Sequence, residues 1–370
     1  MKVIPFYLPQ YHAIPENDEW WGKGFTEWTN VKNAKPLFEG HDQPKRPLND
    51  NYYCLLDDEV KKWQIELAKE NGVYGFCFYH YWFNGHLLLE KPLNQYLNNK
   101  ELDFPFCLCW ANPDWTKIWA GKGSEVLISQ DYYNEKDWEA HFQYLLPFFK
   151  DERYITENEE PLFVIYSPEE IPNLSDLVGF LRKRMKEEGF PGIKLLYQYY
   201  VTPEKDSEIR KLFDYRIRFQ PVHALHDLED NGKKGGVIKA LHVADNVVKK
   251  VTGISMSDHL LKVRKTPYDE VWKKILEYEP VDEKDVAGAF VNWDNTPRRG
   301  NSGRITTGAT PQKFESYLKL LFKKVERCYS TDYVFVTAWN EWSEGSYLEP
   351  DTKDKTDYIN AIKRALENEM

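Results

Sequence analysis

Two glutamates near the C-terminus, Glu341 and Glu344, stand three residues apart and next to two tryptophans in the segment AWNEWSEG. Glycoside cleavage needs one carboxyl group that gives a proton to the leaving oxygen and a second group that acts as base or nucleophile. Indole rings beside a carboxylate can raise its pKa and stack on a sugar ring. We therefore predict that Glu341 and Glu344 are a catalytic pair, and that Trp339, Asn340 and Trp342 contact the substrate.

Polar and aromatic side chains also follow other apolar runs of the chain. The flat faces of the aromatic side chains suit sugar rings, and their polar edges suit the sugar hydroxyl groups. The further residues predicted to bind substrate are Tyr11, His12, Glu27, Trp28, His80, Tyr81, Trp82, Asn112, Trp115, Trp119, Gln220, Trp293, Asp294 and Arg298.

Two of these predictions have structural alternatives. Asp294 either holds sugar hydroxyls, with an arginine nearby binding an anionic group of the substrate, or pairs locally with Arg298. A lone histidine is usually a structural residue, but His12 and His80 both follow a strand end beside a tyrosine, which favours substrate contacts. Metal ligation is the alternative to substrate binding for His12, His80, Glu27 and Asp294. The sequence has no HExxH, paired CxxC or EF-hand spacing and no GxGxxG or P-loop, so we expect neither a metal nor a cofactor.

Composition narrows the class of protein. Aromatic residues make up 15% of the 370 residues, more than packing alone usually requires, and the net charge of -10 argues against a nucleic-acid-binding surface. Cys77, Cys107 and Cys109 lie in apolar runs and are typical of buried thiols in a reducing compartment. No run is apolar for about 18 residues, so we expect no membrane span and a cytoplasmic location.

The elements that must position these residues alternate between strands and helices. Strands are predicted at 3–8, 73–79, 105–110, 161–166, 193–200, 214–219, 286–292 and 333–338, and helices at 59–71, 137–149, 174–188, 311–328 and 356–369. Residues 18–31, DEWWGKGFTEWTNV, are predicted to form a long aromatic loop. This alternation predicts an α/β fold, a (β/α)8 barrel formed by residues 1–370 as a single domain, with a possible helical insertion at 221–280. Because barrel active sites lie at the C-terminal ends of the strands, we expect Glu341 and Glu344 to face one cleft with Trp28, His80, Trp115 and Asp294.

Several motifs resemble those of the WbsX family, whose members carry a domain similar to glycoside hydrolase family 99. They are PFYLPQYHAIPENDEWWGKGFTEWTNV at the start, FCFYHYWFNG, CWANPDWTKIWAG, NWDNTPRRG and AWNEWSEGSYLEPD, and together they cover nearly the whole chain in order. The resemblance implies a metal-independent barrel that acts on α-mannosides with retention of configuration. It also implies that Glu341 deprotonates the sugar 2-hydroxyl, which attacks the anomeric carbon to form an anhydro-sugar, while Glu344 acts first as acid and then as base.

Three functions remain open at this point. The first is a retaining glycoside hydrolase or transglycosylase whose partner is an oligosaccharide or polysaccharide. The second is a glycosyltransferase of surface polysaccharide (lipopolysaccharide O-antigen) biosynthesis, which is what the resemblance to WbsX proteins implies. The third is a glycan-binding barrel without catalysis, which the presence of both glutamates disfavours.

Overall fold

Eight parallel strands close into a barrel in the computed structural model, which describes residues 1–116, 125–200, 206–230 and 263–367. Around the barrel the strand order is β1, β2, β4, β8, β9, β10, β12 and β14, and β14 pairs with β1 to close it. Their bounds are β1 (Lys2–Tyr7), β2 (Phe76–Phe83), β4 (Phe106–Trp110), β8 (Glu160–Ile165), β9 (Lys194–Tyr199), β10 (Tyr215–Arg218), β12 (Asp285–Phe290) and β14 (Tyr333–Thr337). Each overlaps one predicted strand, so the predicted (β/α)8 barrel is confirmed.

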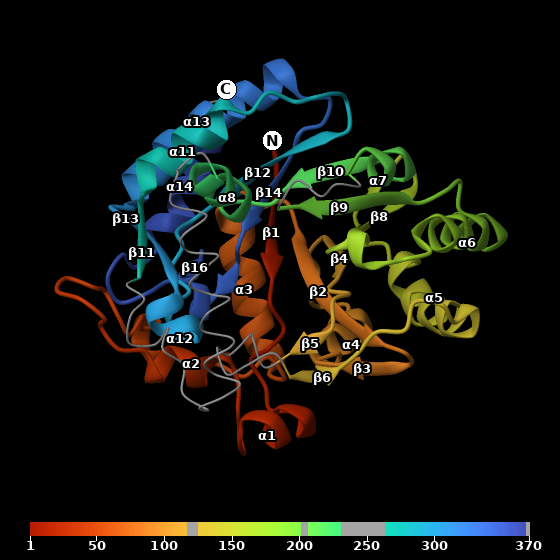
Figure 1. Ribbon diagram of the computed structural model, residues 1–370, viewed down its shortest axis with the longest axis horizontal. Helices are drawn as coiled ribbons and strands as arrows, with labels where there is room; N and C mark the ends of the chain where they lie inside the picture. Colours follow the sequence, from red (N-terminus) through yellow and green to blue (C-terminus); the bar gives the residue numbers. More distant parts are fainter. Residues whose placement is uncertain (117–124, 201–205, 231–262, 368–370) are drawn as a thin grey trace.

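Helices cover the outside of the barrel (Figure 1). They are α3 (Asp58–Glu70), α4 (Lys91–Asn98), α5 (Glu135–Phe149), α6 (Leu174–Glu187), α7 (Asp206–Leu212), α8 (Val222–Asp230), α11 (Tyr268–Glu277), α13 (Pro311–Cys328) and α14 (Asp357–Glu367). In α13 the residues Phe314, Leu318 and Val325 recur at helical spacing and are buried against the barrel. Thr310 caps this helix by accepting a hydrogen bond from the backbone N–H of Lys313 at 3.2 Å.

Side-chain alternation along β2 decides which residues reach the barrel interior. Phe78 packs on Tyr96 of α4, with ring centroids 5.2 Å apart, whereas Tyr79 packs on Phe6 of β1 at 5.6 Å. Because neighbouring side chains of a strand point to opposite faces, Tyr79 and Tyr81 face inward and His80 faces the helices.

The predicted loop at 18–31 is wrong, because this segment overlaps two short helices, α1 (Pro15–Trp21) and α2 (Glu27–Asn33). Proline begins α1, where its missing N–H costs nothing. Thr26 caps α2, and the side chain of Thr29 accepts a hydrogen bond from the Thr26 backbone N–H at 3.3 Å. A threonine at this position does the work of the usual glutamate or glutamine, so the capping signal was missed.

Smaller elements surround the C-terminal ends of the strands. They are β3 (His86–Leu88), β5 (Trp115–Thr116), β6 (Val126–Ile128), β11 (Arg264–Pro267), α12 (Thr296–Arg299), β13 (Arg304–Thr307), β15 (Asn340–Glu341), η5 (Trp342–Glu344) and β16 (Ser346–Tyr347), while β7 (Thr156–Glu157) pairs with the start of β8. Figure 1 shows α1, α2, α12, β5 and β6 together at this end of the barrel.

Parts of two predictions lie outside the described residues: Trp119, and residues 231–262 of the insertion. The single-domain organisation and the insertion at 221–280 stay predictions. Among the helices that the structure describes, none is both long enough and apolar enough to cross a membrane.

Candidate active site

A cavity of about 410 Å³ opens at the C-terminal end of the barrel. Every barrel strand contributes to its wall with a residue at its end or just beyond it: Leu8, Tyr81, Ala111, Tyr166, Tyr200, Phe219, Trp293 and Thr337. Glu341 and Glu344, which follow β14, line the same cavity. The site therefore lies where parallel α/β barrels carry their chemistry.

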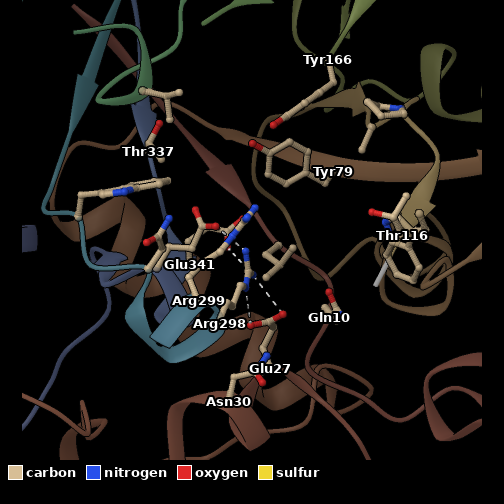
Figure 2. Close-up of a pocket in the computed structure, with 18 of the residues that line it drawn as sticks. Gln10, Glu27, Asn30, Tyr79, Thr116, Tyr166, Arg298, Arg299, Thr337 and Glu341 are labelled. Atoms are coloured by element: carbon tan, nitrogen blue, oxygen red, sulfur yellow. Dashed lines mark hydrogen bonds and ion pairs between the residues drawn. The ribbon is translucent and has the colours of Figure 1, made fainter. Parts of the chain in front are cut away.

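One guanidinium group, that of Arg298, contacts three carboxylates in this cavity, and Figure 2 shows it with two of them, Glu27 and Glu341. Nη1 of Arg298 lies 2.7 Å from Oε1 of Glu344, and Nη2 lies 3.1 Å from Oε2 of Glu341. Nη2 is also 3.1 Å from Oε1 of Glu27, which α2 brings from the other end of the chain. Because both predicted catalytic carboxylates contact the same planar group, they face a common space.

Burial and the neighbouring charges shift the pKa values of this cluster in opposite directions. The pKa of Glu341 is raised to about 8, mainly by burial and also by the carboxylates of Glu344 and Glu27, against the lowering effect of Arg298. Burial alone would lower the pKa of Arg298, but its three carboxylate partners hold that pKa well above its usual range. A carboxyl group with a pKa near 8 can hold or release a proton at neutral pH, as general acid–base catalysis requires.

Local structure fixes the turn that carries the two glutamates. Gly345 ends it with φ of 60°, in the left-handed region that favours glycine, and an added Cβ would lie 3.0 Å from Cβ of Asp294. The backbone N–H of Asp294 donates to the carbonyl of Glu344 at 2.6 Å. Behind the turn, the indole N–H of Trp342 donates to Glu349 at 2.6 Å. These contacts hold the backbone of the turn in place.

Aromatic side chains form another part of the cavity wall. Trp21 and Phe25, from the end of α1 and the residues before α2, line the cavity together with Tyr81 and Trp115. The rings of Tyr81 and Trp115 lie 5.2 Å apart. Figure 2 shows the rings of Tyr79 and Tyr166 above the row formed by Glu341, Arg298 and Glu27. Such a wall offers flat apolar faces next to the carboxylates.

The structure brings seven of the predicted site residues together and places the other residues that it describes elsewhere. The residues that line the cavity are Glu27, Tyr81, Trp115, Trp293, Arg298, Glu341 and Glu344. Tyr11, His12 and Trp28 line a separate hollow beside α2. There the indole N–H of Trp28 donates to the carbonyl of Tyr53 at 2.8 Å, and burial lowers the pKa of His12 to about 4.

The expectation that His80 faces the cleft is wrong, because side chains alternate along β2 and His80 points to the helices. Its Nε2 lies 2.8 Å from Nε2 of His141 on α5, and burial lowers its pKa to about 3. Trp82, on the same face of the strand, stacks on His141 and donates to Asp137 at 3.0 Å. Both side chains pack between the barrel and the helices, away from the cavity.

Asp294 is also placed away from the cavity, and neither sequence alternative describes it. Its carboxylate accepts hydrogen bonds from His41 at 2.8 Å, Gln43 at 2.7 Å and the hydroxyl of Thr296 at 2.6 Å. Although burial opposes ionisation, these donors lower its pKa. Arg298 pairs with the cavity carboxylates instead. Asp294 therefore stabilises the structure next to the site and does not line the cavity.

The other predicted residues that do not line the cavity make hydrogen bonds or packing contacts inside the protein. The amide of Asn112 bonds to both backbone groups of Ser167, at 2.8 Å each, and that of Asn340 bonds to both backbone groups of Leu8, at 2.7 and 3.0 Å. Gln220 accepts from the backbone N–H of Ala224 at 3.2 Å. Trp339 and Trp342 are buried, with Trp339 packed on Phe76 and Trp342 on Tyr347.

Several cavity residues were not among the predicted site residues. They include Gln10, Trp21, Phe25, Asn30, Tyr79, Tyr166, Tyr200, Arg264, Asn295, Arg299 and Arg304. Strand alternation could have identified Tyr79, which shares a face with Tyr81. No local signal identifies Arg264 and Arg304, because they meet only when β11 pairs with β13.

Comparison with known proteins agrees with this fold. The sequence profile of a family described as "Glycosyltransferase WbsX" matches residues 3–362. Two proteins of Xanthomonas campestris pv. campestris, each named "Uncharacterized protein WxcX", are 34% and 33% identical over 98% of this chain. The match covers 49% of each, so the chain spans about half the length of these curated relatives.

Solved structures share the architecture at low sequence identity. One is the GH99 endo-alpha-mannosidase from Bacteroides thetaiotaomicron, with a TM-score of 0.55 and 12% identity over 99% of this chain and 96% of that one. Another is described as a glycoside hydrolase-like protein, with a TM-score of 0.59 and 11% identity over 98% and 93% of the two chains. At these identities the likeness concerns the fold.

Proposed function

This chain belongs to the WbsX glycosyltransferase family and is a carbohydrate-active enzyme, and we propose that it cleaves or transfers a glycosidic bond with retention, using Glu341 and Glu344. The observation that carries the proposal is the contact of both carboxylates with one guanidinium, Arg298, at 3.1 and 2.7 Å in the barrel mouth. A single sugar unit placed there would meet both groups.

The two glutamates are assigned different roles in this scheme. Arg298 contacts both and favours the ionised form of Glu341, whose side chain is 10% exposed while that of Glu344 is 18% exposed. In the proposed first step, the ionised form of Glu341 takes the proton of the sugar 2-hydroxyl, and O2 attacks C1 from the side opposite the leaving group. The C1–oxygen bond of the glycoside breaks, and Glu344 gives its proton to the leaving oxygen.

The second step reverses these roles. Glu344 takes a proton from water or from an acceptor hydroxyl, whose oxygen attacks C1 of the 1,2-anhydro sugar. The C1–O2 bond opens and O2 recovers its proton from Glu341. Two inversions at C1 give net retention, and O2 must lie trans to the leaving group, as it does in an α-mannoside.

Substrate analogues and variants test this scheme. We expect a glycan that the protein cleaves to resist cleavage when the 2-hydroxyl is replaced by hydrogen. Glu344→Gln and Glu341→Gln should each lower kcat by about 100-fold or more, because each removes a proton-transfer group. Glu326→Gln, on the exposed face of α13, is the matched control and should keep full activity. Normal turnover of the 2-deoxy glycan would refute the anhydro-sugar route.

A glycosyltransferase of surface polysaccharide synthesis is the second candidate, and the family description favours it. In that case the protein would release a nucleotide from an activated sugar. Incubation with a panel of nucleotide-sugar donors and an acceptor glycan, followed by measurement of released nucleotide, separates the candidates. Release that depends on the acceptor favours transfer, and cleavage of glycan without any donor favours hydrolysis.

A further inference from the structure

Three arginines lie along the cavity wall beside the glutamates. Arg264 begins β11, Arg304 begins β13, and Arg299 ends α12. In the parallel pair of β11 and β13, Arg264 stands directly opposite Arg304. All three residues line the cavity that holds Glu341 and Glu344. Like charges placed opposite each other in a sheet are destabilising, so packing does not explain this arrangement.

Among the residues that the structure describes, the carboxylates around these arginines do not balance their charge. Glu229 is the partner of two of them, with its Oε1 3.3 Å from Nη1 of Arg264 and its Oε2 2.7 Å from Nη2 of Arg304. Across the described ranges of the chain, the Arg299 guanidinium has no hydrogen-bond or ion-pair partner. Burial lowers the pKa of Arg299, and neighbouring Arg298 and Arg264 lower it further although Glu344 opposes them. This wall is therefore positively charged in a protein whose net charge is -10.

Arg298 does not share this excess of charge. Its guanidinium contacts Glu27, Glu341 and Glu344, so its positive charge is already compensated inside the protein. Arg299 is the next residue of α12, and Figure 2 shows it beside Arg298 in the cavity. An anion bound by Arg299 would consequently lie close to the glutamates. It would belong to the reacting sugar or to a unit attached to it.

We propose that Arg264, Arg299 and Arg304 form a subsite for an anionic group of the substrate, either a sugar carboxylate or a phosphate. The planar fork of a guanidinium matches both groups and binds them through paired, charge-assisted hydrogen bonds. Ser302 and Asn295, which line the same part of the cavity, add polar side chains around the bound group. A neutral glycan would remove water from the Arg299 guanidinium without providing an anionic partner, which is unfavourable.

This inference rests on the proposed function only in taking the ligand to be a sugar, and binding measurements test it without turnover. We would titrate the protein by calorimetry with methyl α-mannoside, its 6-carboxylate (the uronate), mannose 6-phosphate and uridine diphosphate. The wild type should bind at least one anionic probe about ten-fold more tightly than the neutral sugar, as expected for a charge-assisted hydrogen bond. Arg299→Gln should abolish that preference, and Arg299→Lys should keep part of it.

The pattern of binding identifies the source of the anion. Preference for the uronate indicates an acidic glycan, preference for mannose 6-phosphate indicates a phosphorylated glycan, and preference for uridine diphosphate indicates the diphosphate of an activated donor. Arg327→Gln, on the exposed part of α13, removes the same charge elsewhere and should leave the preference unchanged. Equal binding of all probes, binding of none, or a preference that survives Arg299→Gln would overturn the subsite. Absence of turnover with anion preference intact would instead count against the proposed catalysis alone.

Discussion

Replacing Glu341 by glutamine should make the protein more stable, and the gain should grow with pH. The glutamine keeps the shape of the side chain but cannot ionise. In the folded wild type, burial raises the pKa of Glu341 from its usual value near 4.5 to about 8. In the unfolded chain the same carboxyl ionises near its usual pKa, so between these two values only the folded state holds the proton.

The size of the effect follows from this difference in proton binding. Where the folded state binds one proton more than the unfolded state, the free energy of unfolding falls by about 1.4 kcal/mol for each pH unit. The loss begins near pH 4.5 and ends near pH 8, where the folded protein also ionises. Between pH 5 and pH 8 the wild type should therefore lose about 3 kcal/mol relative to Glu341→Gln.

Urea unfolding of both proteins at pH 5, 6, 7 and 8 measures this difference without a substrate. Glu326→Gln, an exposed change of the same kind on α13, should run parallel to the wild type. If the wild type and Glu341→Gln also ran parallel, Glu341 would not carry the raised pKa and the reasoning would fail. The expected result would show that the carboxylate is kept at a cost in stability, which is typical of a catalytic group.

Three further perturbations test the surroundings of the site. Arg298→Gln leaves three carboxylates without their cation and should lower the free energy of unfolding by about 3–5 kcal/mol at pH 7; a loss below 1 kcal/mol in urea unfolding would contradict the ion cluster. Asp294→Ala leaves the donors of His41, Gln43 and Thr296 without an acceptor and should cost about 3 kcal/mol, while the neutral isostere Asp294→Asn should cost less by the same measurement. Because burial lowers the pKa of both His80 and His141, only the unfolded chain binds protons at these two side chains just below about pH 6.5. As pH drops from 6.5 to 5, the wild type should therefore lose stability relative to the double variant His80→Phe/His141→Phe, and parallel curves in urea unfolding would refute this.

The sequence was sufficient to predict the barrel because its elements have strong local signals. Eight apolar runs bounded by turn residues, separated by segments of helical spacing, leave few arrangements other than parallel strands with helices outside. The position of Glu341 and Glu344 after the last strand then fixed the end of the barrel on which they lie. Helix α2 was missed because a threonine took the place of the usual glutamate or glutamine of the capping box, and α1 was missed because no side chain caps it.

The tertiary structure alone decided which of the nearby polar side chains enter the cavity. His80 and Tyr81 are neighbours in sequence, yet the pleat of β2 sends one to the helices and the other into the barrel mouth. Asp294 and Arg298 share one short segment, yet Asp294 bonds to His41 while Arg298 joins Glu27, Glu341 and Glu344. The meeting of Arg264 with Arg304 likewise depends on pairing between β11 and β13. Residue types and strand order are local properties of the chain, whereas the partners of a buried charge depend on contacts between distant segments.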